Sequence, residues 1–596
     1  MRWAAPVIRA GGQADATDDS GESGVREPGR RIPGPVLQGL IAFVIYLVVF
    51  ILAFGQALLP HLNEPRVGQV EVDPNFYIWA WRWWPYALSH ALNPLYSYQI
   101  GAPAGYNLAW ATTSPTAALF MWPVTAAIGP IAAFNLTLLL APPASAWAVF
   151  IVARRLTGQF WAALAAGPVY GFCVYEMAHE VSGQPNLTVT VLIPLIVYLV
   201  LLWWDGRLKQ TGFVIWMTVA IALEFYTFIE AFAEMTMLSV AALVIGFAVA
   251  GRASWPKVAR LAVLTAIAYV GAVVLASPYL IYALRNYPTV LTRQQAKFSL
   301  DFSGLVLPRT DRLLGMKWWA AAAGHDMSAT TYVGIPLLVI LLALAVFCWS
   351  SRLVRLLAVS FVVVIVFAAG PDLMVDGKQV VAWPWAGMWS LPFLKSAEPI
   401  RFIDFAYLVL AIVLALWLAK VTQSRLLRAA RWGLGMLALA AIFADLPTFA
   451  EVVVPPPPTH WKPAIPSAQL TDEIPTFFTH GMYRQYLRQG ETVVVLSHRG
   501  NAGMLFQAYT DFYFKIAGGF INASLSREDA LPMQVALLSH PTRPREAEFR
   551  SYIKSAKIGA LIVEQSWSEH WMYVFGKLGL TAKTVGGVVV FSTKTG

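Results

Sequence analysis

Long apolar stretches separated by short polar loops recur along the first three quarters of this chain. A helix of about 20 apolar residues is long enough to cross the hydrocarbon core of a bilayer, which is about 30 Å thick. The predicted spans lie at roughly residues 36–59, 115–133, 134–153, 160–178, 187–204, 212–230, 232–250, 260–283, 331–350, 354–370, 401–419 and 433–450. The pattern therefore predicts an α-helical, polytopic membrane protein.

Composition supports this prediction and excludes a soluble globule. Of the 596 residues, 58% are hydrophobic and 13% are charged, whereas an average soluble domain carries about 25% charged residues. The net charge of +10 is spread over short loops and the C-terminal region; it indicates membrane topology, and no nucleic-acid partner is expected. Cys173 and Cys348 lie inside apolar stretches, so no disulfide framework is predicted.

Charge in the loops predicts the orientation of the chain. Lys and Arg favour cytoplasmic loops, and their clusters are Arg207/Lys209, Arg252/Lys257/Arg260, Arg352/Arg355 and Lys420/Arg425/Arg428/Arg431. The outer face then carries loops 60–114, 178–186, 284–330 and 371–400 and everything after about residue 451. The polar residues 1–35 are expected to form a disordered cytoplasmic tail rather than a cleavable signal peptide.

The stretch 115–153 does not fit a simple alternation. Arg154 and Arg155 favour the inner face, which requires this stretch to cross once, although it is too long for one helix and too short for three. Either its first half, broken by prolines, is re-entrant or shallow, or the arginine pair breaks the charge rule. The prediction is therefore 11 to 13 crossings.

The first outer loop is rich in aromatic side chains. The segment Phe76–Leu92 carries six aromatic residues among its first nine. Trp and Tyr favour the headgroup level, so an amphipathic helix in the membrane interface is expected there. The helix would serve either as a simple anchor or as part of a binding surface at the lipid boundary.

Beyond the last span the composition changes. A Pro-rich linker at residues 451–466 precedes a predicted extracytoplasmic α/β domain at residues 467–596, after the transmembrane domain at 36–450. Strands are expected at 491–498, 556–565 and 585–593, and a helix at 545–555. This alternation is typical of a small α/β domain.

Acids and bases gather in the outer loops, where polar groups beside a membrane are costly unless they are paired, hydrated or functional. Glu71 and Asp73 follow the first span, and a buried Asp73 would suit a general base, although Asp before Pro is also an ordinary turn. The other candidates, for substrate binding or as plain surface charges, are His179, Glu180, Asn186, Glu224, Glu230, Glu234, Arg285, Arg293, His325 and Arg401.

Several segments resemble the GT-C membrane glycosyltransferases and bacterial multi-span proteins grouped with them. The resemblance rests on DPNFYIWAWRWWPYAL, NPLYSYQIGAPAGYNLAW, FIVARRLTGQFWAALAAGPVYGF, HEVSGQPNLTVTVLIPL, WSLPFLKSAEPIRF and FKIAGGFINA. It implies a polyprenyl-phosphate sugar as donor, a glycan, lipid or protein as acceptor, membrane lipids as partners, and inversion at the anomeric carbon. It also implies a bacterial inner membrane, with the C-terminal domain in the periplasm.

Few residue roles carry over from this class. Its catalytic base matches Asp73, with Glu71 as a second acid, and its phosphate-binding arginine has no unique match; Arg401 is the choice, ahead of Arg285 and Arg293. No cofactor is certain; a divalent cation, Mg²⁺ or Mn²⁺, is the one candidate, and the interrupted order Glu-Val-Asp-Pro weakens it. The rivals are a transporter or flippase, disfavoured by the lack of an internal repeat, and a non-catalytic envelope-assembly scaffold.

Overall fold

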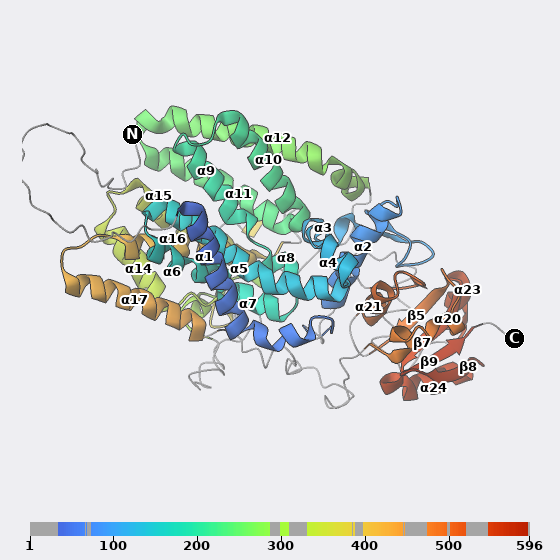
Figure 1. Ribbon diagram of the computed structural model, residues 1–596. Coiled ribbons are helices and arrows are strands. Elements are labelled where there is room, and N and C mark those ends of the chain that lie inside the picture. The colour runs from blue at the N-terminus through green and yellow to red at the C-terminus, as the bar shows by residue number, and fades with distance from the viewer. Residues whose placement is uncertain are drawn as a thin grey trace, which may run out of the picture.

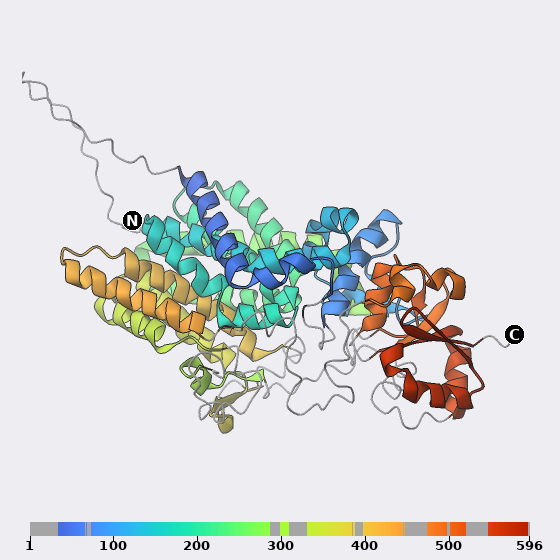
Figure 2. The same cartoon turned by 60° about the horizontal axis from the view of Figure 1, so that its bottom comes forward.

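The structure is a computed structural model that describes residues 34–65, 67, 73–285, 298–308, 331–383, 386–387, 397–444, 446, 474–497, 501–519 and 546–593. A helical bundle forms the larger part, and a small sheet with helices lies at one end of it (Figure 1). Helix α2 lies between the two parts, and the turned view in Figure 2 keeps this order. The predicted combination of a helical membrane protein with a small α/β region is confirmed.

Apolar helices build the bundle. Their bounds are α1 Pro35–Ala53, α2 Asp73–Ser89, α3 Pro115–Phe120, α4 Trp122–Ala127, α5 Pro130–Thr157, α6 Phe160–Gly171, α7 Val174–Val181, α8 Pro185–Thr188, α9 Leu192–Trp204, α10 Gln210–Thr227, α11 Ile229–Ala250, α12 Trp255–Arg285, α14 Ile335–Phe347, α15 Arg352–Ala368, α16 Ile403–Ala419 and α17 Arg425–Ala444. By length and composition, 7 helical segments of the described chain can cross a membrane. The protein is therefore a multi-pass membrane protein.

Four shorter helices pack among these segments. Helices α6, α10, α14 and α15 have 12, 18, 13 and 17 residues, and they contact the longer helices α5, α12 and α16. They are shorter than a full span of about 20 residues, so the predicted 11 to 13 crossings and the placement of the two ends on opposite faces stay predictions.

The difficult stretch at 115–153 contains one helix that is long and apolar enough to cross a membrane. Its first part forms the six-residue helices α3 and α4, and its second part is the single 28-residue helix α5. Proline explains the breaks, since it lacks the N–H that a continuing helix needs. Arg155 pairs with Asp205, beside the predicted inner loop. The span expected at 115–133 is therefore wrong, and the shallow alternative fits.

The basic loops meet at one end of the bundle, as the charge pattern predicts. Lys257 donates to the carbonyl oxygen of Trp204 over 2.6 Å, and Arg352 donates to Ser254 over 3.5 Å. Acids gather instead at the opposite end, where α10 ends and α11 and α16 begin. The two ends therefore differ in charge as the two faces of a membrane protein do.

Helix α2 is buried rather than interfacial. The side chains of Trp79, Trp81 and Trp83 are at most 1% exposed, because the helix packs on α3 and α5 of the bundle and on α21 of the C-terminal region. The expected amphipathic helix in the membrane interface is therefore wrong. A helix with aromatic residues around its whole circumference needs protein on every side.

The C-terminal region contains one five-stranded mixed sheet in the order β6-β5-β7-β9-β8. Its elements are α19 Thr476–Thr479, α20 Tyr483–Tyr486, β5 Thr492–Leu496, α21 Ala502–Tyr509, β6 Lys515–Ile516, α23 Glu546–Ser555, β7 Ile558–Glu564, α24 Ser568–Lys577, β8 Thr581–Val585 and β9 Val588–Ser592. The three predicted strands and the predicted helix are present. The exposed edge strand β8 and helices α21 and α24 were not expected, since β8 carries little apolar signal.

The outer loops add two hairpins, β1 Tyr96–Ser97 with β2 Tyr106–Asn107 and β3 Asp372–Val375 with β4 Lys378–Ala382. Asp301 stabilises the second hairpin by accepting hydrogen bonds from the backbone amides of Asp376 and Gly377, over 3.1 and 2.6 Å. Burial raises the pKa of Asp301, but these bonds and those from Ser303 outweigh it, so that the pKa lies below its usual value. Asp301 thus joins the segment 298–308 to the β3–β4 hairpin.

Candidate active site

Asp73 begins α2 at the acidic end of the bundle and is half-buried. The side-chain amide of Gln184 donates to its Oδ2 over 2.6 Å. The amide oxygen of Gln184 lies 2.7 Å from Nδ1 of His179, so Nδ1 carries the proton in this arrangement. Gln184 thereby orients the Asp73 carboxylate, and His179 orients Gln184.

His179 takes part in this series of hydrogen bonds as a neutral group. Burial lowers its pKa to about 4, against the hydrogen bond with Gln184, and the positive charge of Arg401 lowers it further. The imidazole therefore stays uncharged near neutral pH. Its role in the geometry is to donate a hydrogen bond rather than to supply charge.

Tyr77 links Asp73 to the interior of the bundle. It lies one helical turn after Asp73, and its hydroxyl donates to Oδ1 of Asn186 over 2.5 Å. Burial raises the pKa of Tyr77 well above its usual value; the negative charge of Asp73 raises it further, and Arg401 lowers it. Through Asn186, which lines the same cavity as Arg401, Tyr77 connects α2 to that cavity.

Arg401 is largely buried and already paired. It lies in the turn Pro399–Phe402 before α16 and forms ion pairs with Glu230 and, over 2.9 Å, with Glu398. The ring of Phe228 packs against its guanidinium at 5.1 Å, which is within the range of a cation–π contact. Two carboxylates and one aromatic face therefore hold the guanidinium in place.

A small cavity of about 10 Å³ adjoins Arg401, with room for about one water molecule. Its polar lining comes from Arg401, Asn186, Thr190, Tyr175 and three carboxylates, Glu224, Glu234 and Asp404. Each of these carboxylates keeps one buried oxygen without a hydrogen-bond partner among the described residues. The second oxygen of Asp404 accepts from Tyr170 over 2.9 Å. This cavity therefore carries three carboxyl groups beside Arg401.

The structure brings some of the predicted site residues together and leaves others apart. Asp73, His179, Glu230 and Arg401 belong to the connected region just described. Glu180 is buried in α7 but does not line the cavity, and Arg285 is exposed at the end of α12. The predictions for Glu71, Arg293 and His325 fall outside the described residues.

Sequence reasoning missed Gln184, Tyr77 and Asp404. Asp404 had a usable signal, because a carboxylate inside an apolar span is a functional candidate by default. Gln184 and Tyr77 had none, since an amide in a loop and a tyrosine among many aromatics are ordinary. Only their contacts with Asp73 and Asn186 single them out.

The described residues do not fit a metal site. No group of three or more His, Cys, Asp or Glu side chains among them is placed to hold an ion, and the described partner of Asp73 is an amide. The divalent cation stays a prediction that depends on Glu71, which lies outside the described residues.

No family model and no curated protein matches the sequence, but solved structures match the fold. Over 94% of this chain the fold is similar to the arabinofuranosyltransferase AftD from mycobacteria, with a TM-score of 0.56 and 15% identity. Over 94% it is also similar to the oligosaccharyltransferase AglB from Archaeoglobus fulgidus, solved with an inhibitory peptide and a dolichol-phosphate, with a TM-score of 0.50 and 11% identity.

These similarities establish the fold, which is that of the GT-C glycosyltransferases. The identities are too low to assign an activity by descent alone. The matched regions cover 40% of the arabinofuranosyltransferase chain and 74% of the oligosaccharyltransferase chain. This chain therefore spans less than half the length of the first of them.

Proposed function

We propose that this protein is an inverting membrane glycosyltransferase that moves a sugar from a polyprenyl-phosphate donor to an acceptor on the outer face of the membrane. The observations that carry the proposal are the oriented carboxylate of Asp73, the contact of its helix with the cavity-lining Asn186 through Tyr77, and the buried cation Arg401 in the same cavity lining, in a GT-C fold. A solved relative in fold has dolichol-phosphate bound, which supports a lipid phosphate as the donor group.

In this mechanism Asp73 acts as general base. An acceptor hydroxyl attacks the anomeric carbon from the face opposite the phosphate, and its proton passes to the Asp73 carboxylate. The bond between the anomeric carbon and the phosphate oxygen breaks, and polyprenyl phosphate leaves with the electron pair. Inversion follows because attack and departure occur on opposite faces, while Gln184 keeps the carboxylate directed.

Arg401 would stabilise the leaving phosphate. Positive charge directed at a developing anion is a large contribution to transition-state stabilisation, and an arginine fork matches phosphate oxygens. In the described state the guanidinium contacts Glu230 and Glu398 instead. Donor binding in this proposal therefore exchanges at least one carboxylate of Arg401 for the phosphate.

The substitution Asp73→Asn tests the catalytic assignment. It keeps the size of the side chain but removes the base, so we expect transfer to fall by at least 100-fold, the scale of general-base catalysis. The assay uses proteoliposomes and a panel of radiolabelled undecaprenyl-phosphate sugars that includes arabinofuranose. Binding of undecaprenyl phosphate should stay within twofold.

The same assay separates an enzyme from the rival functions. A transferase releases free undecaprenyl phosphate together with a labelled product, whereas a flippase moves the donor without breaking it and a scaffold does neither. Full transfer by Asp73→Asn would remove the residue from catalysis. No release of the lipid phosphate with any donor of the panel would contradict the proposed function.

A further inference from the structure

Helix α2 carries two polar and aromatic stripes at helical spacing. Tyr77, Trp81 and Trp84 face the bundle side, where Trp81 donates to Thr137 over 3.0 Å and Trp84 donates to Thr113 over 3.1 Å. The other stripe, Trp79, Arg82, Trp83 and Tyr86, faces the C-terminal region. The helix that begins with Asp73 is therefore held from both sides.

Gln507 of α21 is the centre of the second contact. Its side chain is 0% exposed, and its Oε1 accepts from the indole of Trp79 over 2.7 Å. Its Nε2 donates to the carbonyl oxygens of Gln99 and Phe514, over 2.7 and 2.8 Å. One amide thus joins α2, the outer loop after it, and the segment that leads into β6.

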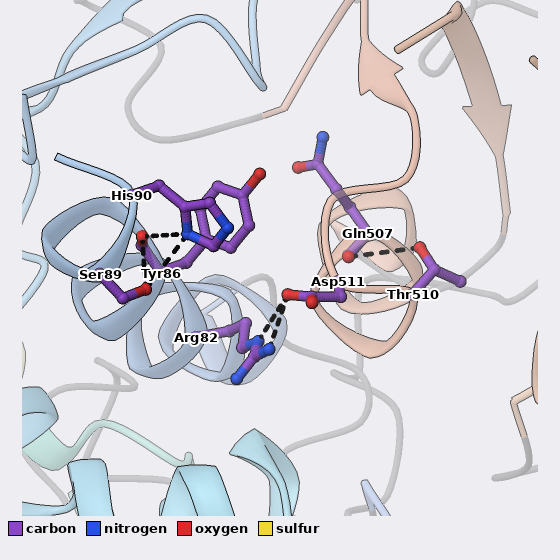
Figure 3. Close-up of polar contacts among 7 residues, drawn as sticks. All are labelled: Arg82, Tyr86, Ser89, His90, Gln507, Thr510 and Asp511. Atoms are coloured by element: carbon purple, nitrogen blue, oxygen red, sulfur yellow. Dashed lines mark hydrogen bonds and ion pairs between the residues drawn. The ribbon is translucent and has the colours of Figure 1, made fainter. Parts of the chain in front are cut away.

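Phe512 and an ion pair extend the contact along α2. The ring of Phe512 lies edge-on to Trp79 and Trp83, at 5.9 and 5.6 Å, and 4.5 Å from Tyr86. Arg82 binds Oδ1 of Asp511 through Nε and Nη2, over 3.0 and 2.7 Å, and Figure 3 shows this pair between the two helices.

The outer loop also joins the C-terminal region through its backbone. The amide of Ile516 donates to the carbonyl oxygen of Gln99 over 2.8 Å, and the amide of Ala102 donates to that of Ile516 over 3.0 Å. The loop is thereby paired alongside β6. A buried aromatic contact together with this backbone pairing is a fixed attachment rather than a passing encounter.

The buried groups dominate this attachment. Arg82 and Asp511 are 26% and 56% exposed, and exposed ion pairs contribute little. Gln507 and Trp79 are fully buried. Loss of Gln507 would leave the indole N–H of Trp79 without its acceptor, and loss of Trp79 would leave Oε1 of Gln507 without its donor, which is far more costly in a buried setting. Rotation of α2 would break this pair as well as the bond between Gln184 and Asp73.

We propose that the C-terminal region is a positioning element for catalysis, in which Gln507 and Phe512 fix the rotation of α2 and so keep the Asp73 carboxylate in the orientation set by its hydrogen bond with Gln184. The proposal rests on the proposed function for its effect on turnover. Gln507, about two turns of α2 away from Asp73 through Trp79, acts as a positioning residue and does not touch the reacting atoms.

The first test is Gln507→Leu in the full chain. Loss of the Trp79 bond should loosen α2, so we expect amide hydrogen exchange in residues 77–83 to accelerate at least tenfold. In the transfer assay kcat should fall about tenfold, while the affinity for undecaprenyl phosphate, held by the bundle, stays within twofold. A purely structural role would change the amount of folded protein and leave kcat per folded molecule unchanged.

A second, milder test uses the ion pair, because Gln507→Leu risks misfolding. Arg82→Glu and Asp511→Arg should each lower kcat about threefold, in keeping with a partly exposed pair, and the double variant should restore it. Asp205→Arg is the matched control: it breaks the ion pair with Arg155 at the basic end and should leave kcat unchanged.

The outcomes separate this inference from the proposed function. Suppose that amide exchange is faster in Gln507→Leu but that Asp73→Asn still transfers sugar at the wild-type rate. The catalytic role of Asp73, and with it the expected effect on turnover, would then be refuted, while the attachment of α2 to the C-terminal region would stand. Unchanged exchange and kcat in Gln507→Leu, or no recovery in the charge-swapped double variant, would overturn the positioning role. Neither of these results bears on whether sugar transfer occurs.

Discussion

At the scale of single residues, the site places its charges in two different settings. Asp73 is half-buried and hydrogen-bonded to an amide, which leaves it suited to accept a proton. Arg401 is enclosed by Glu230, Glu398 and Phe228, so its charge is already compensated. A phosphate that enters must compete with these carboxylates, and donor affinity should respond to them.

This competition predicts opposite effects at the two ends of one ion pair. Arg401→Ala should weaken binding of undecaprenyl phosphate about 10- to 100-fold, the scale of a charge-assisted hydrogen bond. Glu230→Gln removes a competing negative charge and should tighten binding. Titration of detergent-solubilised protein with undecaprenyl phosphate measures both, and Arg285→Ala, at an exposed position outside the cavity, serves as the control.

The control also decides between the two arginines. Weaker binding in Arg285→Ala, with wild-type affinity in Arg401→Ala, would move the phosphate site to the end of α12. Weaker binding in Glu230→Gln would show that the carboxylate supports Arg401 rather than competing for it.

At the scale of elements, small residues let helices approach closely. Gly167 and Gly171 lie one turn apart on α6 and face α5. A Cβ at Gly171 would overlap the carbonyl oxygen of Pro142 and the amide nitrogen of Ala146. In a bilayer, where lipid is as apolar as a side chain, such close packing is a main source of helix association.

Gly171→Ala should therefore destabilise the bundle, by about 1–3 kcal/mol, because backbone atoms of α5 have to shift. The matched control is Gly433→Ala in α17, where an added Cβ meets nothing within 4 Å. There the gain in helix propensity should be neutral or stabilising, by about 0.5–1 kcal/mol. Thermal unfolding in detergent compares the two, and equal midpoints would contradict close packing of α5 on α6.

At the scale of the whole molecule, the acidic and basic ends of the bundle predict its orientation in the membrane. The site, α2 and the C-terminal region lie at the acidic end, which the loop charges assign to the outside. Cysteine labelling tests this, because Cys173 is buried and Cys348 is partly buried in the bundle.

Intact cells should label one engineered position and not the other. Ser89→Cys, exposed at the end of α2, should react with a membrane-impermeant maleimide. Gln423→Cys, exposed in the turn between α16 and α17, should react only after the membrane is permeabilised. The reverse pattern would place Asp73 in the cytoplasm and remove the proposed access to an outer-leaflet donor.

Local patterns in the sequence determined most of the architecture. Hydropathy over about 20 residues is a local property, and so is loop charge; together they predicted the membrane class, the alternation of basic loops and the three main strands of the C-terminal sheet. Asp73 and Arg401 were also chosen from local signals, as charged side chains at the edges of apolar segments.

Tertiary structure decided which segments meet. The FYIWAWRWWPYAL segment reads as an interfacial helix while it is considered alone, and it becomes a buried helix only because α21, more than 400 residues away along the chain, covers its second face. Likewise, only hydrogen bonds with partners distant in sequence reveal the roles of Gln184, Asp404 and Gln507. Periodicity records that a face is apolar, but the identity of the surface that covers it depends on long-range packing.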